Sequence, residues 1–144
     1  MNRQYKPDLF VKYAPRVTRR RRAAVNRICE ANDMPEADVL RYSFEAAVLT
    51  KKLKRSTSAD PAPLDAMMTV RTTRAIGRRV HELWMNNPNV LKANILRALL
   101  ENTLSVAESR GMAHVMKLRE EALDKAPKTE GRITTHRQRL ERKG

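Results

Sequence analysis

The side chains best suited to chemistry in this sequence are its cations, and the chemistry they suggest is anion binding. Lysine and arginine number 30 against 16 aspartates and glutamates, and the formal net charge is +14. A small domain folds without such an excess, because repulsion between like charges opposes a compact state. A polyanionic partner explains the excess, with nucleic acid as the first candidate and an anionic membrane surface as the second.

The densest basic run, residues 19–22, consists of four arginines directly after Thr18. Thr18 suits the N-cap of a helix, and cations in the first turn of a helix oppose its dipole. A bound anion would offset that cost, and phosphate is the natural one. Arginine also follows Thr73, a second candidate N-cap. The residues expected to contact phosphate here are Arg19, Arg20, Arg22 and Arg74, with a solvated charged face as the alternative.

Catalytic and metal chemistry find no support in the sequence. The histidines (His81, His114 and His136) have no cysteine or acid at ligand spacing. The four glycines are isolated, so no phosphate-binding glycine loop is present. Cys29 is the single cysteine, which excludes an internal disulfide and favours a reducing compartment. We therefore predict no enzyme, no cofactor, no metal site, no membrane segment and a cytoplasmic protein.

Hydrophobic periodicity divides the chain into two similar units. Alternating strand patterns precede helical stripes in both, and polar breaks at Asn32–Pro35 and Asn86–Asn89 separate two helices in each. The predicted segments are an arm (1–11), a first strand–helix–helix unit (12–54), a linker (55–66), a second unit (67–111), an extra helix (112–125) and a basic tail (126–144).

The two units form an internal repeat. An offset of 55 positions superposes the strands and first helices, and one extra residue in the second break makes it 56 for the second helices. The matched pairs include Arg16 with Arg71, Thr18 with Thr73, Arg19 with Arg74, Val25 with Val80, Val39 with Ile95, and Glu45 with Glu101. One strand and two short helices cannot bury a core alone. We therefore expect a mostly helical fold in which the two strands pair as one short antiparallel ribbon over four helices.

This order of elements resembles the ribbon-helix-helix family, the Arc and MetJ type of repressor. The resemblance covers about 12–54 and 67–110, and it includes Asp38-Val39-Leu40-Arg41 and Asn94-Ile95-Leu96-Arg97 at the second helix of each unit. The tandem form is similar to TraY-type proteins of conjugative plasmids. It implies a single-chain pseudo-dimer that binds double-stranded DNA in the bacterial nucleoid or on a plasmid. A relaxase or other transfer protein, and further copies of the chain on DNA, are the implied additional partners.

The resemblance also implies which strand residues face the bases. A two-stranded ribbon fits the major groove, and alternation sends every second side chain outward. The base-facing residues are then Lys12, Ala14 and Arg16 in the first strand and Met67, Thr69 and Arg71 in the second. Pro15 has no backbone N–H and leaves the register of the first strand open by one residue. Because the two strands differ, we expect an asymmetric DNA site.

The family also holds a phosphate at the start of each second helix, through free backbone N–H groups. Asn89, Lys92 and Asn94 suit an anion at this place in the second unit. Glu36 and Asp38 occupy it in the first unit and would repel one. The expected phosphate clamp is therefore stronger in the second unit.

Three functions follow as hypotheses. The first is sequence-specific binding of double-stranded DNA, as a transcriptional regulator or as an accessory (relaxosome) protein of plasmid transfer. The second is a non-specific architectural or RNA-binding protein, which the charge alone would support. The third is an adaptor that binds a protein partner through residues 112–144, with the apolar face of 112–123 as the contact.

Overall fold

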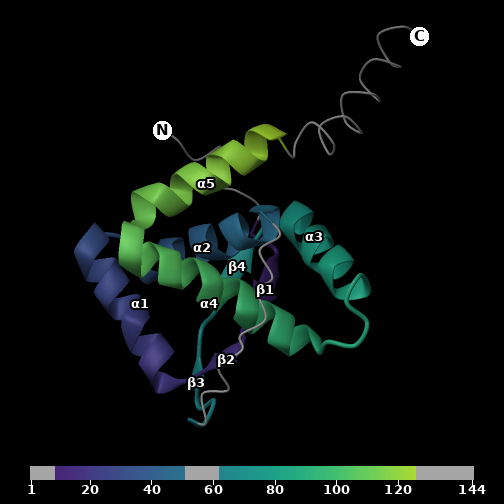
Figure 1. Cartoon of the computed structure of the whole chain (residues 1–144), viewed down its shortest axis with the longest axis horizontal. Coiled ribbons are helices and arrows are strands. Elements are labelled where there is room, and N and C mark those ends of the chain that lie inside the picture. Colours follow the sequence, from purple (N-terminus) through teal and green to yellow (C-terminus); the bar gives the residue numbers. More distant parts are fainter. Residues whose placement is uncertain (1–8, 51–61, 126–144) are drawn as a thin grey trace, which may run out of the picture.

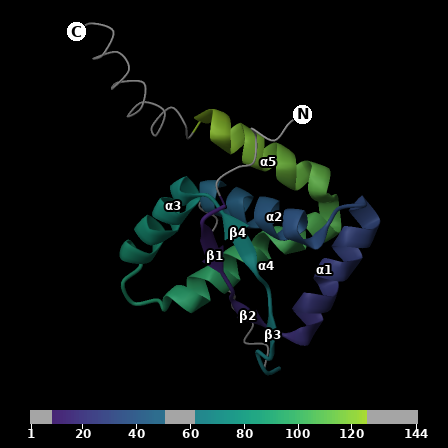
Figure 2. The same cartoon turned by 180° about the vertical axis from the view of Figure 1, so that it is seen from behind.

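The computed structural model describes residues 9–50 and 62–125. In chain order the elements are β1 (Val11–Tyr13), β2 (Arg16–Val17), α1 (Arg19–Asn32), α2 (Glu36–Thr50), β3 (Ala66–Met67), β4 (Val70–Thr72), α3 (Arg74–Met85), α4 (Lys92–Arg110) and α5 (Met112–Lys125). The described part is mostly helical, with one short antiparallel ribbon (Figure 1). From behind, the strands lie in front of α2 and α4, so the ribbon forms one face of the molecule (Figure 2).

The ribbon joins a strand segment of the first unit to one of the second. β1 pairs with β4 and β2 with β3, and both pairs are antiparallel. Between the two pairs, the Met68 N–H donates to the Pro15 carbonyl at 3.1 Å. The register is therefore continuous, and Pro15 causes no one-residue shift because it contributes its carbonyl rather than the N–H it lacks.

Both predicted N-caps are confirmed. The Thr18 hydroxyl accepts from the Arg21 N–H at 3.2 Å, and the Thr73 hydroxyl accepts from the Ile76 N–H at 3.3 Å. Each threonine has extended backbone angles, so it ends a strand and begins a helix within one residue. These caps fix the angle at which α1 and α3 leave the ribbon.

Loss of either cap should destabilise the fold. We expect Thr18→Ala and Thr73→Ala each to lower the free energy of unfolding by about 1 kcal/mol, because one backbone N–H loses its partner. Urea unfolding measures the effect, with Thr18→Ser and Thr73→Ser as controls that keep the hydroxyl. Equal stability of the alanine and serine variants would show that the caps contribute nothing.

The core is built around α2. Every residue of α2 from Ser43 to Leu49 is buried, as expected for a helix that other elements contact on all sides. α2 contacts β4 and the other four helices. The Phe44 ring lies 5.5 Å from the Tyr13 ring beneath the ribbon, measured between centroids. Burial raises the pKa of the Tyr13 phenol, which stays neutral there.

Some boundaries and core assignments differ from the sequence predictions. The strands begin at Val11 and Ala66, one residue earlier than predicted in each unit. Met85, a core candidate by its position in the sequence beside Trp84, is 60% exposed, because it lies at the end of α3. Residues 1–8 of the predicted arm, 51–54 of the first unit, 55–61 of the predicted linker and the whole predicted tail (126–144) lie outside the described residues.

Within the described ranges, the structure contains no helix long and apolar enough to cross a bilayer. The same ranges hold no group of three or more histidine, cysteine, aspartate or glutamate side chains that is placed to bind a metal. Burial, and then the nearby charge of Glu36, raise the pKa of the Cys29 thiol. A thiol whose pKa is raised is a poor nucleophile at neutral pH.

Candidate nucleic-acid interface

The outer face of the ribbon brings together all six residues predicted to face bases. Their side chains are exposed, whereas the alternate residues point inward and are buried or half-buried. The outward set is Lys12, Ala14, Arg16, Met67, Thr69 and Arg71, and the inward set is Tyr13, Pro15, Val17, Met68, Val70 and Thr72. The predicted alternation is therefore present along the whole ribbon.

The outer face carries positive charge that no acidic side chain in the described part of the chain offsets. The register places Lys12 directly opposite Arg71, while Arg16 lies opposite Met67. The strand segments 11–17 and 66–72 contain no aspartate or glutamate. Among the described residues, no ion pair involves Lys12, Arg16 or Arg71. Like charges directly opposite each other destabilise a two-stranded pair, so this arrangement favours a bound anion.

The arginine run at the start of α1 is largely paired within the protein. Arg19 contacts Asp65 at 3.0 Å, Arg21 contacts Glu101 at 3.2 Å, and Arg22 contacts Glu36. Asp65 directly precedes β3, Glu101 lies on α4, and Glu36 is the first residue of α2. The fold therefore brings three acids from distant parts of the chain to the start of α1. Arg20 is exposed and has no acidic partner in the described part of the chain. Arg19 and Arg22 are predicted to contact phosphate, and each would have to exchange its acidic partner for the phosphate; that contact stays a prediction.

The start of α3 differs, because no acid among residues 9–50 and 62–125 pairs with its first arginine. The Arg74 guanidinium lies over the Phe10 ring, 4.4 Å from its centroid. Phe10 precedes β1 and is 67% exposed. An aromatic ring orients a cation without neutralising it. Arg74 therefore keeps its positive charge beside the end of the ribbon where Lys12 and Arg71 lie.

The start of α4 lies close to the same end of the ribbon. The Lys92 amino group is 5.6 Å from the Tyr13 ring centroid and 5.4 Å from that of Trp84. Leu91 occupies the N-cap and makes no side-chain hydrogen bond to the helix. The Asn94 side-chain oxygen accepts from Arg97 at 2.7 Å, and Asn89 is exposed. The first turn of α4 thus has no acidic residue, whereas that of α2 has two.

Comparison of the chain with protein-family models, curated proteins and solved structures finds no match.

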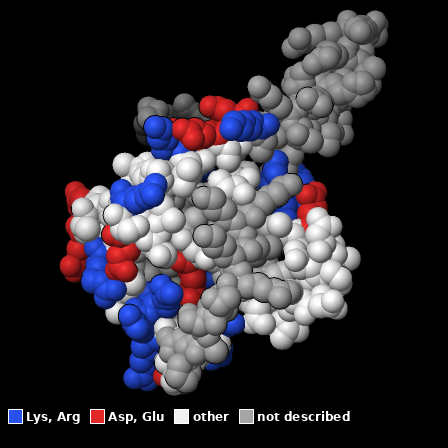
Figure 3. Space-filling view, in the orientation of Figure 1, with Lys and Arg blue, Asp and Glu red and all other residues white. Residues whose placement is uncertain are grey.

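The face opposite the ribbon has a mixed charge pattern. Figure 3 views the molecule from the side of α4 and α5, where positive and negative side chains alternate over α5 and along α1. The ion pair between Arg27 on α1 and Glu108 on α4, at 2.9 Å, is an example of this mixing. The two faces therefore differ, because the ribbon segments contain cations and no acid.

The apolar side of α5 is covered by the rest of the fold. Met112 and Val115 are buried, and α5 contacts α2 and α4. The Met112 N–H donates to the side-chain oxygen of Asn32 at 3.0 Å, which anchors the start of α5 to the end of α1. The apolar face of 112–123 therefore packs on its own domain, which is the alternative to a partner contact, and an adaptor function of residues 112–144 stays a prediction.

Sequence reasoning missed a buried polar cluster around Glu45. Glu45 is 2% exposed and contacts Thr72 on β4 and Arg119 on α5. One signal was available, since Glu45 is the single charged residue between Phe44 and Leu49, a stretch that is otherwise apolar. Its partners could not be found from the sequence, because they lie 27 and 74 residues away.

The pairing pattern predicts different roles for Arg20 and Arg22. If Arg20 neutralises one phosphate, Arg20→Ala should lower the salt dependence of DNA binding by about 0.9 in the slope of log K against log salt concentration. Arg22→Ala should leave that slope unchanged and lower stability, because Glu36 loses its partner. Titrations at several salt concentrations, with urea unfolding of both variants, make the comparison. An equal change of slope in both variants would contradict the assignment.

Proposed function

We propose that this chain binds double-stranded DNA sequence-specifically, as a tandem ribbon-helix-helix pseudo-dimer whose ribbon enters the major groove. The observation that carries the proposal is the outer face of the ribbon. It presents Lys12, Arg16 and Arg71 without an acidic partner among the described residues, and two of these cations are directly opposed. A two-stranded ribbon has the width to enter the major groove.

The relation between the two units supports the pseudo-dimer part of the proposal. Both units have the order strand, N-capped helix, break, helix. The contacts between units are also reciprocal: α2 contacts β4 and α4 contacts β2, while α1 contacts α4 and α2 contacts α3. A two-fold relation between the halves of one chain accounts for this exchange. Such a protein would read two unlike half-sites, since Lys12 with Arg71 at one end differs from Arg16 with Met67 at the other.

Five of the six outward residues match a base partner in chemistry. Arg71 and Arg16 suit bidentate contacts with guanine, Lys12 suits a guanine acceptor, and Thr69 suits a base edge or a thymine methyl. Met67 is 52% exposed and suits apolar contact with a thymine methyl. Arg20, Arg74 and the start of α4 would hold phosphates beside the groove. In the cell this activity would serve transcriptional regulation or plasmid transfer, with a relaxase as the partner in the second case.

Selection from random duplex DNA at about 0.2 M salt tests the proposal, because the non-specific electrostatic contribution is weakened there. The wild type should select a defined, asymmetric motif. Arg71→Ala should relax one position of it. Arg110→Ala is the matched control, since Arg110 is exposed at the end of α4, outside the ribbon. If the wild type binds every duplex equally, sequence-specific reading fails and the non-specific architectural function becomes the better account.

A further inference from the structure

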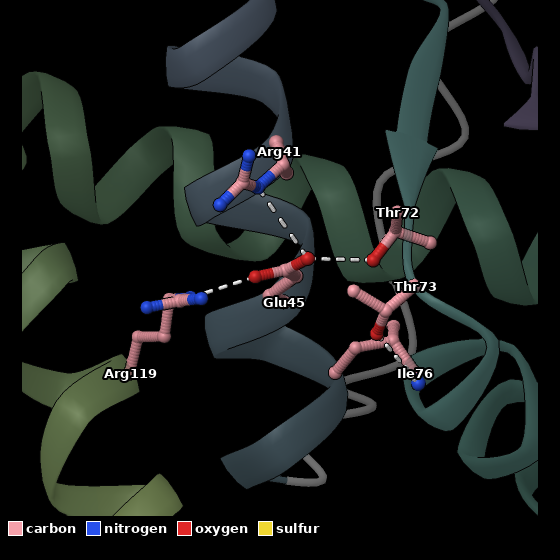
Figure 4. Close-up of polar contacts among 6 residues, drawn as sticks. All are labelled: Arg41, Glu45, Thr72, Thr73, Ile76 and Arg119. Atoms are coloured by element: carbon pink, nitrogen blue, oxygen red, sulfur yellow. Dashed lines mark hydrogen bonds and ion pairs between the residues drawn. The ribbon is translucent and has the colours of Figure 1, made fainter. Parts of the chain in front are cut away.

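A buried carboxylate links α5 to the ribbon. Glu45 on α2 accepts a hydrogen bond from the Thr72 hydroxyl, with 2.6 Å between the two oxygens. The other carboxylate oxygen lies 2.7 Å from the Arg119 Nε on α5. Arg41 approaches from one turn away, at 3.7 Å. Figure 4 shows that Arg119 and Thr72 reach Glu45 from opposite sides. A single side chain therefore joins α2, β4 and α5.

The link reaches the ribbon next to a base-facing residue. Thr72 is buried and points inward, so the neighbouring Arg71 points outward. On its other side, Thr73 caps α3 through the Ile76 N–H, as Figure 4 also shows. Holding Thr72 therefore holds the backbone between an outward arginine and a helix cap.

The described residues at the other end of the ribbon form no such link. Val17 occupies the place that matches Thr72 and is fully buried. Glu101, which matches Glu45, pairs with Arg21 at 3.2 Å and Arg97 at 3.7 Å. Within the described structure, the polar connection thus exists only at the end where Lys12 and Arg71 are opposed and like charges repel across the ribbon.

Arg119 is the partner that compensates the free-energy cost of burying the Glu45 carboxylate. A buried carboxylate is costly unless an opposite charge and hydrogen bonds compensate it. The Arg119 guanidinium is itself held over the Tyr42 ring, 5.1 Å from the centroid. Without Arg119, the Glu45 carboxylate would gain from moving toward water, and that movement would release Thr72.

We propose that Arg119 is a positioning residue for base reading at the β1–β4 end of the ribbon, acting through Glu45 and Thr72. The inference rests on the proposed DNA binding. In this proposal α5 influences base recognition, although α5 contributes none of the proposed DNA contacts. Thr72→Val tests the link most directly, because it removes one hydroxyl, keeps the side-chain shape and leaves the contact between Glu45 and Arg119 intact.

The experiment measures base preference at both ends of the selected site, and hydrogen exchange of the ribbon amides without DNA. Thr72→Val and Arg119→Met should lower the preference at the base pair read by Arg71 at least about fivefold, the lower limit for one bidentate contact. Amides of β4 should exchange faster in both variants. The preference at the Arg16 end should stay unchanged, and Arg119→Lys should restore part of the loss. Lys117→Ala, an exposed change on α5, and Thr50→Val, at the end of α2, are the controls.

Wild-type preference and exchange in Thr72→Val would overturn the proposal, and so would an equal loss at both ends, which indicates general destabilisation. If Arg119→Met does not fold, Thr72→Val still gives the answer. A wild type without any preferred sequence defeats the proposed function and the base-reading role together. In that case the exchange data alone report whether Arg119 and Glu45 hold β4.

Discussion

Replacing Arg71 with alanine should weaken binding to the preferred duplex by about 5- to 150-fold, the range that one bidentate arginine–guanine contact provides. The loss should be confined to one base pair, because one arginine side chain contacts one guanine. Arg71 can make this contact because it has no acidic partner in the described structure. Quantitative binding to the selected site and to single-base variants of it gives the measurement.

The same substitution should slightly stabilise the free protein. Arg71 faces Lys12 across the ribbon, and such like-charge pairs cost about 0.2–1 kcal/mol at low salt. A double-mutant cycle of Arg71→Ala, Lys12→Ala and the double variant tests this repulsion. Once one of the two cations has been removed, removal of the other should raise the free energy of unfolding by less than it does in the wild type. Unfolding in urea at low and high salt measures it. Lower stability in both single variants would show that the opposed cations are not under repulsion.

Replacing Arg119 with alanine should lower the free energy of unfolding by about 3–5 kcal/mol, because it leaves a buried carboxylate without its principal partner. Glu45 is 2% exposed, and the Arg119 Nε is 2.7 Å from its oxygen. Few single substitutions reach this size, and those that do usually create a buried unpaired charge or a cavity. Urea or thermal unfolding gives the measurement, with Lys117→Ala as the matched control on the same helix.

A combined variant distinguishes the destabilisation caused by breaking the Glu45–Arg119 pair from the stability that the intact pair contributes. Replacing Arg41, Glu45 and Arg119 together with apolar residues of similar volume should recover most of the stability, since a well-packed apolar cluster replaces buried charges with little loss. The Thr72 hydroxyl would then need replacing as well, as in Thr72→Val. A combined variant as unstable as Arg119→Ala alone would show that packing of the arginine stem, and not charge compensation, is the larger effect.

Local patterns in the sequence determined most of the ribbon and its helices. Alternation identified which strand residues point outward, and threonine before a basic run identified the caps of α1 and α3. The repeat indicated that the strands of the two units pair. These features depend on neighbouring residues, or on one periodicity matched against another, so they can be read without knowing the rest of the fold.

Tertiary structure decided which charges remain available and what α5 does. In the sequence, the four arginines at the start of α1 are indistinguishable. In the structure, three of them form ion pairs with acids from distant parts of the chain, such as Glu101. The apolar side of α5 suits a partner protein as well as it suits the domain's own core, and only packing on α2 shows which surface it covers. The contact between Glu45 and Arg119 likewise spans 74 residues. Pairing of side chains depends on distances in space, and the order of residues along a chain does not fix those distances until the helices have packed.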